Sequence, residues 1–225
     1  MKKYLFITIS MVLIASCSVK TNEEKARELI EPDVKEHLIK PESFQFAEFQ
    51  LDSCFKDDPR NPESMIFSLK LIKLYNEYKE FSKEAERAES YMTIYDSSYG
   101  YQSAHSKLQE EKYKAEMERA RHKVSMVKDK IFQLYKDNQH MLENINNGNH
   151  ELMGWVAYFS FRTETADGHK TMGVAVYYLN KELNKITHRL SEEELKNIER
   201  NNIDDLKYEL REDLSEMFGN QKQYE

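Results

Sequence analysis

The chain has 225 residues, of which 33 are basic and 40 acidic, and its formal net charge is −7. This acidic balance disfavours nucleic acid as a partner, because neutralising phosphates requires clustered lysine and arginine. The six glycines lie apart from one another, which excludes glycine-rich phosphate loops and sharp nucleophile turns. The length suits one domain with a real core, or a small domain plus an extended element.

Residues 1–17 read MKKYLFITISMVLIASC and have the pattern of a secretory signal. Two lysines come first, an apolar stretch covers residues 4–14, and small residues lead to Cys17. The apolar stretch is shorter than the roughly 20 residues of a bilayer-spanning helix, so we expect residues 1–16 to be a cleaved signal peptide. The alternatives are an ordinary signal with an incidental cysteine and a soluble protein with an apolar first helix.

The tetrad Ile14-Ala15-Ser16-Cys17 resembles the lipobox of bacterial lipoproteins. The resemblance implies cleavage between Ser16 and Cys17, and acyl chains, palmitate among them, on the new N-terminal cysteine. Residues 17–21 would form a lipidated tether, and the lipid bilayer would be a partner through acylated Cys17. The implied location is the bacterial cell envelope, at the outer membrane, with the periplasmic and the surface face both open.

A helix is expected after the tether, because Thr21-x-x-Glu24 has the spacing of a capping box. Pro32 should kink or restart this helix, and Pro41 should end it. The apolar residues of the helix fall on one face: Ala26, Leu29, Ile30, Val34 and Leu38. Residues 43–55 follow as a strand, in which a shift of register near residues 46–47 brings both sets of apolar side chains to the core.

Two heptad runs form the clearest pattern in the chain. In the first, spacings of four and three alternate through Phe67, Leu71, Leu74, Tyr78, Phe81, Ala85, Ala88, Met92 and Tyr95. The second has the same spacing through Tyr113, Met117, Ala120, Val124, Val127, Ile131, Leu134, Asn138, Met141 and Ile145. Such heptads predict two supercoiled helices of about 35–45 residues, and the short break at 96–103 makes them antiparallel. Residues 62–145 are therefore expected to form an inserted coiled-coil hairpin.

Tyrosines gather near the expected tip of this hairpin: Tyr91, Tyr95, Tyr99, Tyr101 and Tyr113. Tyrosine is enriched in interface hot spots, so Tyr95, Tyr99 and Tyr101 are candidates for contacting a partner protein or a glycan. An alternative, which stays open here, is that some of these rings only close the end of the coil. Asn138 lies at a seam position, where it either selects the register of the hairpin or marks a base at which packing loosens.

Residues 153–179 are expected to form a β-hairpin with Asp167-Gly168 in its turn, followed by a brief third strand at 185–187. Apolar residues on both faces of the hairpin imply cover on both sides. A second capping box, Ser191-x-x-Glu194, opens a C-terminal helix that Asn201-Asn202 can interrupt. Residues 22–61 and 146–219 would form a small α+β domain, and residues 220–225 a loose tail.

The predicted fold class is therefore α+β: a small antiparallel sheet packed by N- and C-terminal helices, with a long antiparallel coiled-coil hairpin inserted. The segments LIKPESFQFAEFQLD and GWVAYFSFRTETADGHKTMGVAVYYLNKEL resemble uncharacterised lipoproteins of Bacteroidota-type bacteria. This resemblance implies a small lipid-anchored α+β domain of unknown role, and the heptad insertion lies outside it.

The sequence contains no recognisable catalytic motif, and none of its histidines has a neighbour at metal-ligand spacing. We therefore expect no enzymatic activity, no metal and no cofactor. Cys54, the second of two cysteines, is interpreted as a small apolar residue near a strand end. The leading hypothesis is an envelope lipoprotein that acts through protein contacts of its hairpin. The alternative is a periplasmic or surface module that binds a small ligand or glycan around Trp155.

Overall fold

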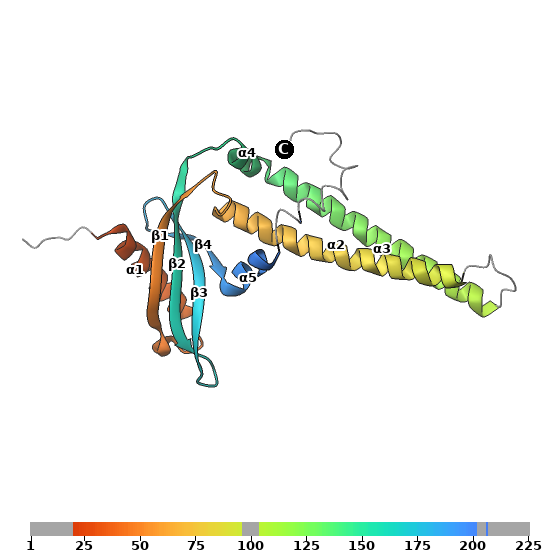
Figure 1. Cartoon of the computed structure of the whole chain (residues 1–225), viewed down its shortest axis with the longest axis horizontal. Coiled ribbons are helices and arrows are strands. Elements are labelled where there is room, and N and C mark those ends of the chain that lie inside the picture. Colours follow the sequence, from red (N-terminus) through yellow and green to blue (C-terminus); the bar gives the residue numbers. More distant parts are fainter. Residues whose placement is uncertain (1–19, 96–103, 202–205, 207–225) are drawn as a thin grey trace, which may run out of the picture. The chain divides into compact units, whose positions relative to one another are not determined.

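The computed structural model describes residues 20–95, 104–201 and 206, and within them the fold is α+β, as predicted. A four-stranded antiparallel sheet has the order β1-β2-β3-β4 (Figure 1). In chain order the elements are α1 (Asn22–Glu36), a 3-10 turn η1 (Pro41–Ser43), β1 (Gln45–Phe55), α2 (Pro62–Tyr95), α3 (Ala104–Asp137), α4 (Gln139–Asn146), β2 (Leu152–Glu164), β3 (Lys170–Asn180), β4 (Ile186–Ser191) and α5 (Glu192–Arg200).

The chain divides into two compact units. The sheet unit comprises the described residues up to Ser53 together with Gly154–Arg189, and the hairpin unit comprises Cys54–Met153 and the described residues from Leu190 onward. Each unit has a hydrophobic cluster of its own.

Helix α1 begins as the capping box predicts. The Thr21 hydroxyl accepts the Glu24 backbone N–H at 3.2 Å, and the Glu24 carboxylate accepts the Thr21 N–H at 2.8 Å. Pro32 lies inside one helix, so the expected restart at this residue does not occur. The helix ends at Glu36, ahead of Pro41, which was expected to end it. Burial of apolar residues on both sides of Pro32 holds the helix together, and Pro41 instead opens the 3-10 turn.

The core of the sheet unit forms where α1 lies against one face of the sheet (Figure 1). Phe159 of β2 is fully buried at its centre, with Phe44, Phe46 and Phe49 ring centroids 5.8–6.2 Å away. Phe46 and Phe49 have opposite parity in β1 and both rings lie near the Phe159 ring, although Phe46 stays 41% exposed. The shift of register near residues 46–47 stays a prediction. The Tyr177 hydroxyl donates to the Asp33 carboxylate at 2.7 Å, which ties β3 to α1.

Strands β2 and β3 pair in the predicted hairpin, with Trp155 opposite Leu179 and Phe161 opposite Gly173. The turn contains Gly168 at φ +85°, a conformation that glycine adopts at no steric cost. The opposite face of the two strands is buried as well, at Val156, Val176 and Tyr178, as the apolar pattern predicts. Strand β4 is longer than the predicted segment 185–187 and continues to Ser191.

Helices α2 and α3 pack against each other as the antiparallel hairpin (Figure 1). Each has 34 residues, slightly fewer than expected. Three contacts between the helices define the pairing: the Tyr95 and Tyr113 rings stack with centroids 5.8 Å apart, and the ion pairs Lys123–Glu84 and Arg121–Glu89 are both 3.0 Å long. Every predicted seam residue is buried or half-buried, which confirms the heptads.

The second helix of the hairpin is interrupted at Asn138, although the heptad pattern continues through this residue. The Asn138 backbone N–H donates to the Tyr135 carbonyl at 3.2 Å, and its side-chain amide donates to the Leu134 carbonyl at 2.7 Å. The side-chain amide thus occupies the Leu134 carbonyl, which in a continuous helix would accept the backbone N–H of Asn138. Helix α4 then begins as a separate helix with Asn138 as its N-cap. Met141 of α4 returns to the core of the hairpin unit. This geometry favours the interpretation that Asn138 lies at the base of the hairpin, where the packing between the helices loosens.

Helix α5 starts at the predicted capping box, since Ser191 and Glu194 bond each other's backbone N–H groups at 2.8 and 3.3 Å. It ends at Arg200 with Asn201 as its C-cap, at the predicted interruption. The helix contacts α2, and Ile198 and Leu206 pack against the hairpin core. The structure therefore groups the C-terminal helix with the hairpin by its contacts.

Candidate functional site

The residues proposed for lipidation and cleavage, Cys17 and Ser16, lie outside the described residues, as do Tyr99 and Tyr101. Tyr95 is described, and it is the last residue of α2. It forms part of a cluster at the loop end of the hairpin, which we take as the candidate functional site.

Three tyrosines stack at this end of the hairpin. The Tyr113 ring of α3 lies against two rings of α2, with centroids 5.0 Å from Tyr91 and 5.8 Å from Tyr95. The ring planes are inclined by only 23° and 11°. Stacked rings at this spacing attract one another and hold a rigid, amphipathic surface. Tyr95 and Tyr113 occupy the seam and close the end of the coil, whereas Tyr91 remains 49% exposed. Contact of these tyrosines with a partner stays a prediction.

Two further apolar side chains project close to the same end of the hairpin. Ile94 of α2 is 71% exposed and Leu108 of α3 is 63% exposed. With Tyr91 they form what we call the apolar tip, defined as Tyr91, Ile94 and Leu108. Exposed apolar groups that gather in one part of a fold are typical of interaction sites.

A groove opens between α2 and α3 beside the tyrosine stack, with a volume of about 360 Å³. It lies at the level of Ala88 and Ala120, two buried seam residues whose side chains are too small to fill the space between the helices. Tyr91 and Tyr113 line it as well. We call this the side groove; its other lining residues are Glu84, Arg87, Glu116, Arg119 and Lys123.

The charges around the side groove are unevenly compensated. Glu84 pairs with Lys123 at 3.0 Å, and Glu116 pairs with Lys112 at 3.8 Å. Among the residues that the structure describes, neither Arg87 nor Arg119 has an ion-pair or hydrogen-bond partner. The lining has three basic and two acidic residues, so within the described part of the chain the groove carries a positive balance on an acidic protein.

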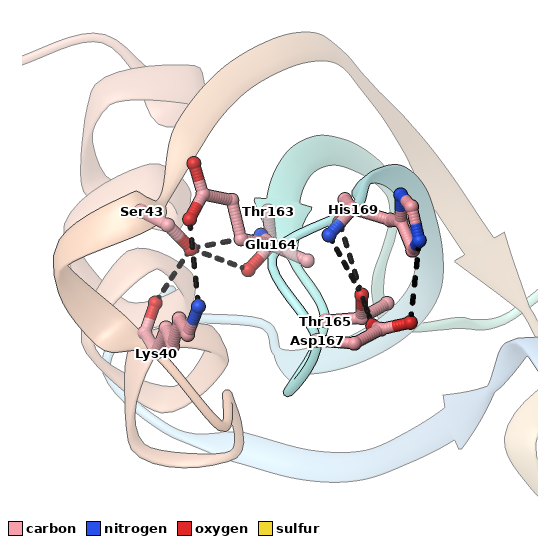
Figure 2. Close-up of polar contacts among 7 residues, drawn as sticks. All are labelled: Lys40, Ser43, Thr163, Glu164, Thr165, Asp167 and His169. Atoms are coloured by element: carbon pink, nitrogen blue, oxygen red, sulfur yellow. Dashed lines mark hydrogen bonds and ion pairs between the residues drawn. The ribbon is translucent and has the colours of Figure 1, made fainter.

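Polar residues also gather where the sheet unit reaches the turn between β2 and β3 (Figure 2). The Ser43 hydroxyl donates to the Lys40 carbonyl at 2.7 Å and accepts the Glu164 N–H at 2.9 Å. Its one proton is thus used, so the Thr163 hydroxyl, 2.9 Å away, is the donor in their contact. The Ser43 hydroxyl therefore donates one hydrogen bond and accepts two, so it links η1 to β2. Its lone pairs are all in use, which does not suit a nucleophile.

A single carboxylate lies beside each of three histidines: His37, His150 and His169. Figure 2 shows His169 beside Asp167 in the β2–β3 turn, where the closest nitrogen and oxygen are 3.4 Å apart. In the hairpin unit, His150 stacks on Phe55 with centroids 3.8 Å apart and lies 3.2 Å from the Asp57 carboxylate. In the described ranges no three metal-ligating side chains converge.

Cys54 is buried near the end of β1, as the sequence interpretation expects. The pKa of its thiol is raised to about 11, mainly by burial and also by the Asp58 carboxylate, while the Arg60 guanidinium acts in the opposite direction. The thiol therefore keeps its proton at neutral pH, and the reactive thiolate is scarce.

Trp155, at the centre of the alternative ligand site, packs against the core of the sheet unit. Its indole N–H donates to the Lys181 carbonyl at 3.1 Å, so its polar group is already used within the fold.

In the part of the chain that the structure describes, no helix is both long and apolar enough to cross a bilayer. No protein-family model, curated protein or solved structure matches this chain.

Proposed function

We propose that this protein is a lipid-anchored protein of the bacterial cell envelope that acts without catalysis, through protein contacts at the loop end of its helical hairpin. The observation that carries the proposal is the apolar tip: Ile94 and Leu108 stay exposed near a tyrosine stack, and Tyr91 of that stack is itself 49% exposed. A partner protein that covered them would remove apolar surface from water at about 25 cal/mol per Å².

The length of the helices supports this role. Tyr91 lies 29 residues after Pro62, the first residue of α2, which corresponds to about 45 Å of helix. Interface hot spots are enriched in tyrosine and surrounded by contacts that exclude water. A stiff two-helix element that carries such residues at its far end is suited to presenting a contact surface at a distance from its own base.

The lipid anchor rests on the N-terminal sequence, and Cys17→Ser tests it. Loss of the sulfur removes the acylation site, so we expect the variant to carry no acyl chains and to leave the detergent phase on phase partitioning. Each buried methylene contributes about 0.8 kcal/mol to membrane binding, so the loss of whole chains is decisive. Intact mass measurement of the native protein should show a mature chain that starts at acylated Cys17. A variant that stays in the detergent phase after signal removal would contradict the anchor.

The contact surface is tested by the double substitution Ile94→Ser and Leu108→Ser. Both positions are highly exposed, so folding should change by less than about 0.5 kcal/mol per site. We expect the variant to lose the protein that cross-links to the wild-type hairpin in intact membranes, as measured by pull-down and mass spectrometry.

The matched control is Met126→Ser, which removes an apolar side chain that is 48% exposed on the same helix, about 27 Å from Leu108 along α3. This variant should retain the partner. Equal recovery of the partner by wild type and the Ile94→Ser/Leu108→Ser variant would disprove the proposed role of the tip.

A further inference from the structure

We propose that the side groove binds a carboxylate-bearing segment of the partner protein, with Arg87 and Arg119 as the residues that hold the carboxylates. The inference deepens the proposed function and rests on it, because it names the chemistry of the partner that contacts the loop end of the hairpin.

The shape of the groove follows from the sequence of the seam. Ala88 and Ala120 are buried seam residues at one level of the hairpin, so a depression remains where larger residues would meet. Tyr91 and Tyr113 line this depression with aromatic surface. Its volume, about 360 Å³, is at the low end of the range for ligand pockets, about 300–1,000 Å³. A space of this size suits one or two side chains of an extended or helical segment.

The charge of the groove selects an acidic occupant. Both glutamates that line it are in ion pairs with lysines, whereas the two guanidinium groups have no partner in the described part of the chain. A guanidinium group presents a planar fork of donors that matches a carboxylate in a bidentate arrangement. Arg87 lies on α2 and Arg119 on α3, so a segment laid across the groove could meet one arginine from each helix.

The aromatic residues add a second requirement. Stacked tyrosine rings offer apolar faces next to the two cationic groups, so the preferred segment carries an aromatic residue between carboxylates. This pattern distinguishes the occupant from a nucleic acid, which would need a broad cluster of lysine and arginine that the net charge of −7 does not supply.

The test uses the intact protein in detergent micelles and two short peptides, acetyl-GEFEG-amide and its neutral analogue acetyl-GQFQG-amide, in titration calorimetry. We expect the glutamate peptide to bind at least about tenfold more tightly than the glutamine peptide. The double variant Arg87→Gln/Arg119→Gln should lose this preference. Both arginines are exposed, and circular dichroism will verify that the variant remains folded.

The matched control is Arg121→Gln. Arg121 lies two residues from Arg119 on the same helix, but it pairs with Glu89 and does not line the groove. The control should bind the glutamate peptide within about twofold of wild type. The inference is overturned if the two peptides bind equally, if neither binds, or if Arg121→Gln weakens binding as much as the double variant does.

Failure of the groove and failure of the tip give different results. In one outcome the Arg87→Gln/Arg119→Gln variant still captures the membrane partner and the Ile94→Ser/Leu108→Ser variant does not. This result would disprove the binding role of the side groove and leave the contact role of the apolar tip intact. If both variants capture the partner as wild type does, the proposed function itself falls.

Discussion

Replacing Ile131 with aspartate is expected to unfold the hairpin unit. Ile131 is completely buried in the seam, within the hydrophobic cluster that includes Tyr78, Val127 and Leu134. Truncation of such a side chain costs about 2–5 kcal/mol, and a carboxylate at the same place adds the cost of burying an unpaired charge. We expect a loss of more than about 4 kcal/mol in the free energy of unfolding. Urea denaturation followed by circular dichroism at the helical minimum measures this loss.

Met126→Asp is the control for this prediction. It introduces the same charge on the same helix at a half-exposed position, where substitutions usually change stability by less than about 0.5 kcal/mol. Similar midpoints for the Ile131→Asp variant and the control would contradict the seam, because the helices would then not depend on the burial of its residues.

The substitution Phe159→Ala is expected to have a comparable effect on the sheet unit. Phe159 is fully buried and contacts the rings of Phe44, Phe46, Phe49 and Phe161. Its truncation removes the centre of this cluster and leaves a cavity, which typically costs about 3–5 kcal/mol. Trp155, the one tryptophan of the chain, lies in β2, so its fluorescence reports on the unfolding of this unit.

Met172→Ala provides the comparison for the sheet unit. Met172 lies in β3 and is exposed, so its truncation should leave the tryptophan transition close to that of wild type. A fluorescence midpoint of Phe159→Ala that matches wild type would mean that the aromatic cluster does not stabilise the sheet.

The regular elements of this fold could be predicted because their signals are local or periodic. The capping boxes at Thr21 and Ser191 set the first residues of α1 and α5 by contacts within four residues. The alternating spacing of apolar residues predicts which residues form the seam of the hairpin, because each helix must bury one apolar stripe against the other helix. The turn at Gly168 followed in the same way from two strands separated by turn residues.

The fold departs from the sequence predictions where distant contacts outweigh local preference. The predicted restart at Pro32 does not occur, because residues on both sides of it are buried against the sheet. At Asn138 the helix breaks although no break is predicted, because the heptad pattern continues past Asp137, the last residue of α3. The Asn138 side-chain amide competes with the backbone for the Leu134 carbonyl. Local packing determines whether the side chain wins this competition, and the heptad pattern carries no information about that packing.

The sequence directs attention to the tyrosines near residue 95, but it gives no direct sign of the side groove. Nor does it show that Arg87 and Arg119 lack a partner among the residues that the structure describes. A signal for the groove was present, because alanine occupies a seam position in both heptad runs, at Ala88 and Ala120. That these two alanines lie at the same level depends on the register of the helices, which the interhelical contacts establish.

By itself the sequence determined the kinds of element, their order, and which stripe of each long helix is buried, because these properties depend on hydrophobic periodicity and on contacts a few residues apart. The tertiary structure alone decided which side chains of separate helices face each other, which charges find partners, and which stay exposed. Those outcomes depend on the register between helices, and a shift of one turn would exchange every partner along the groove.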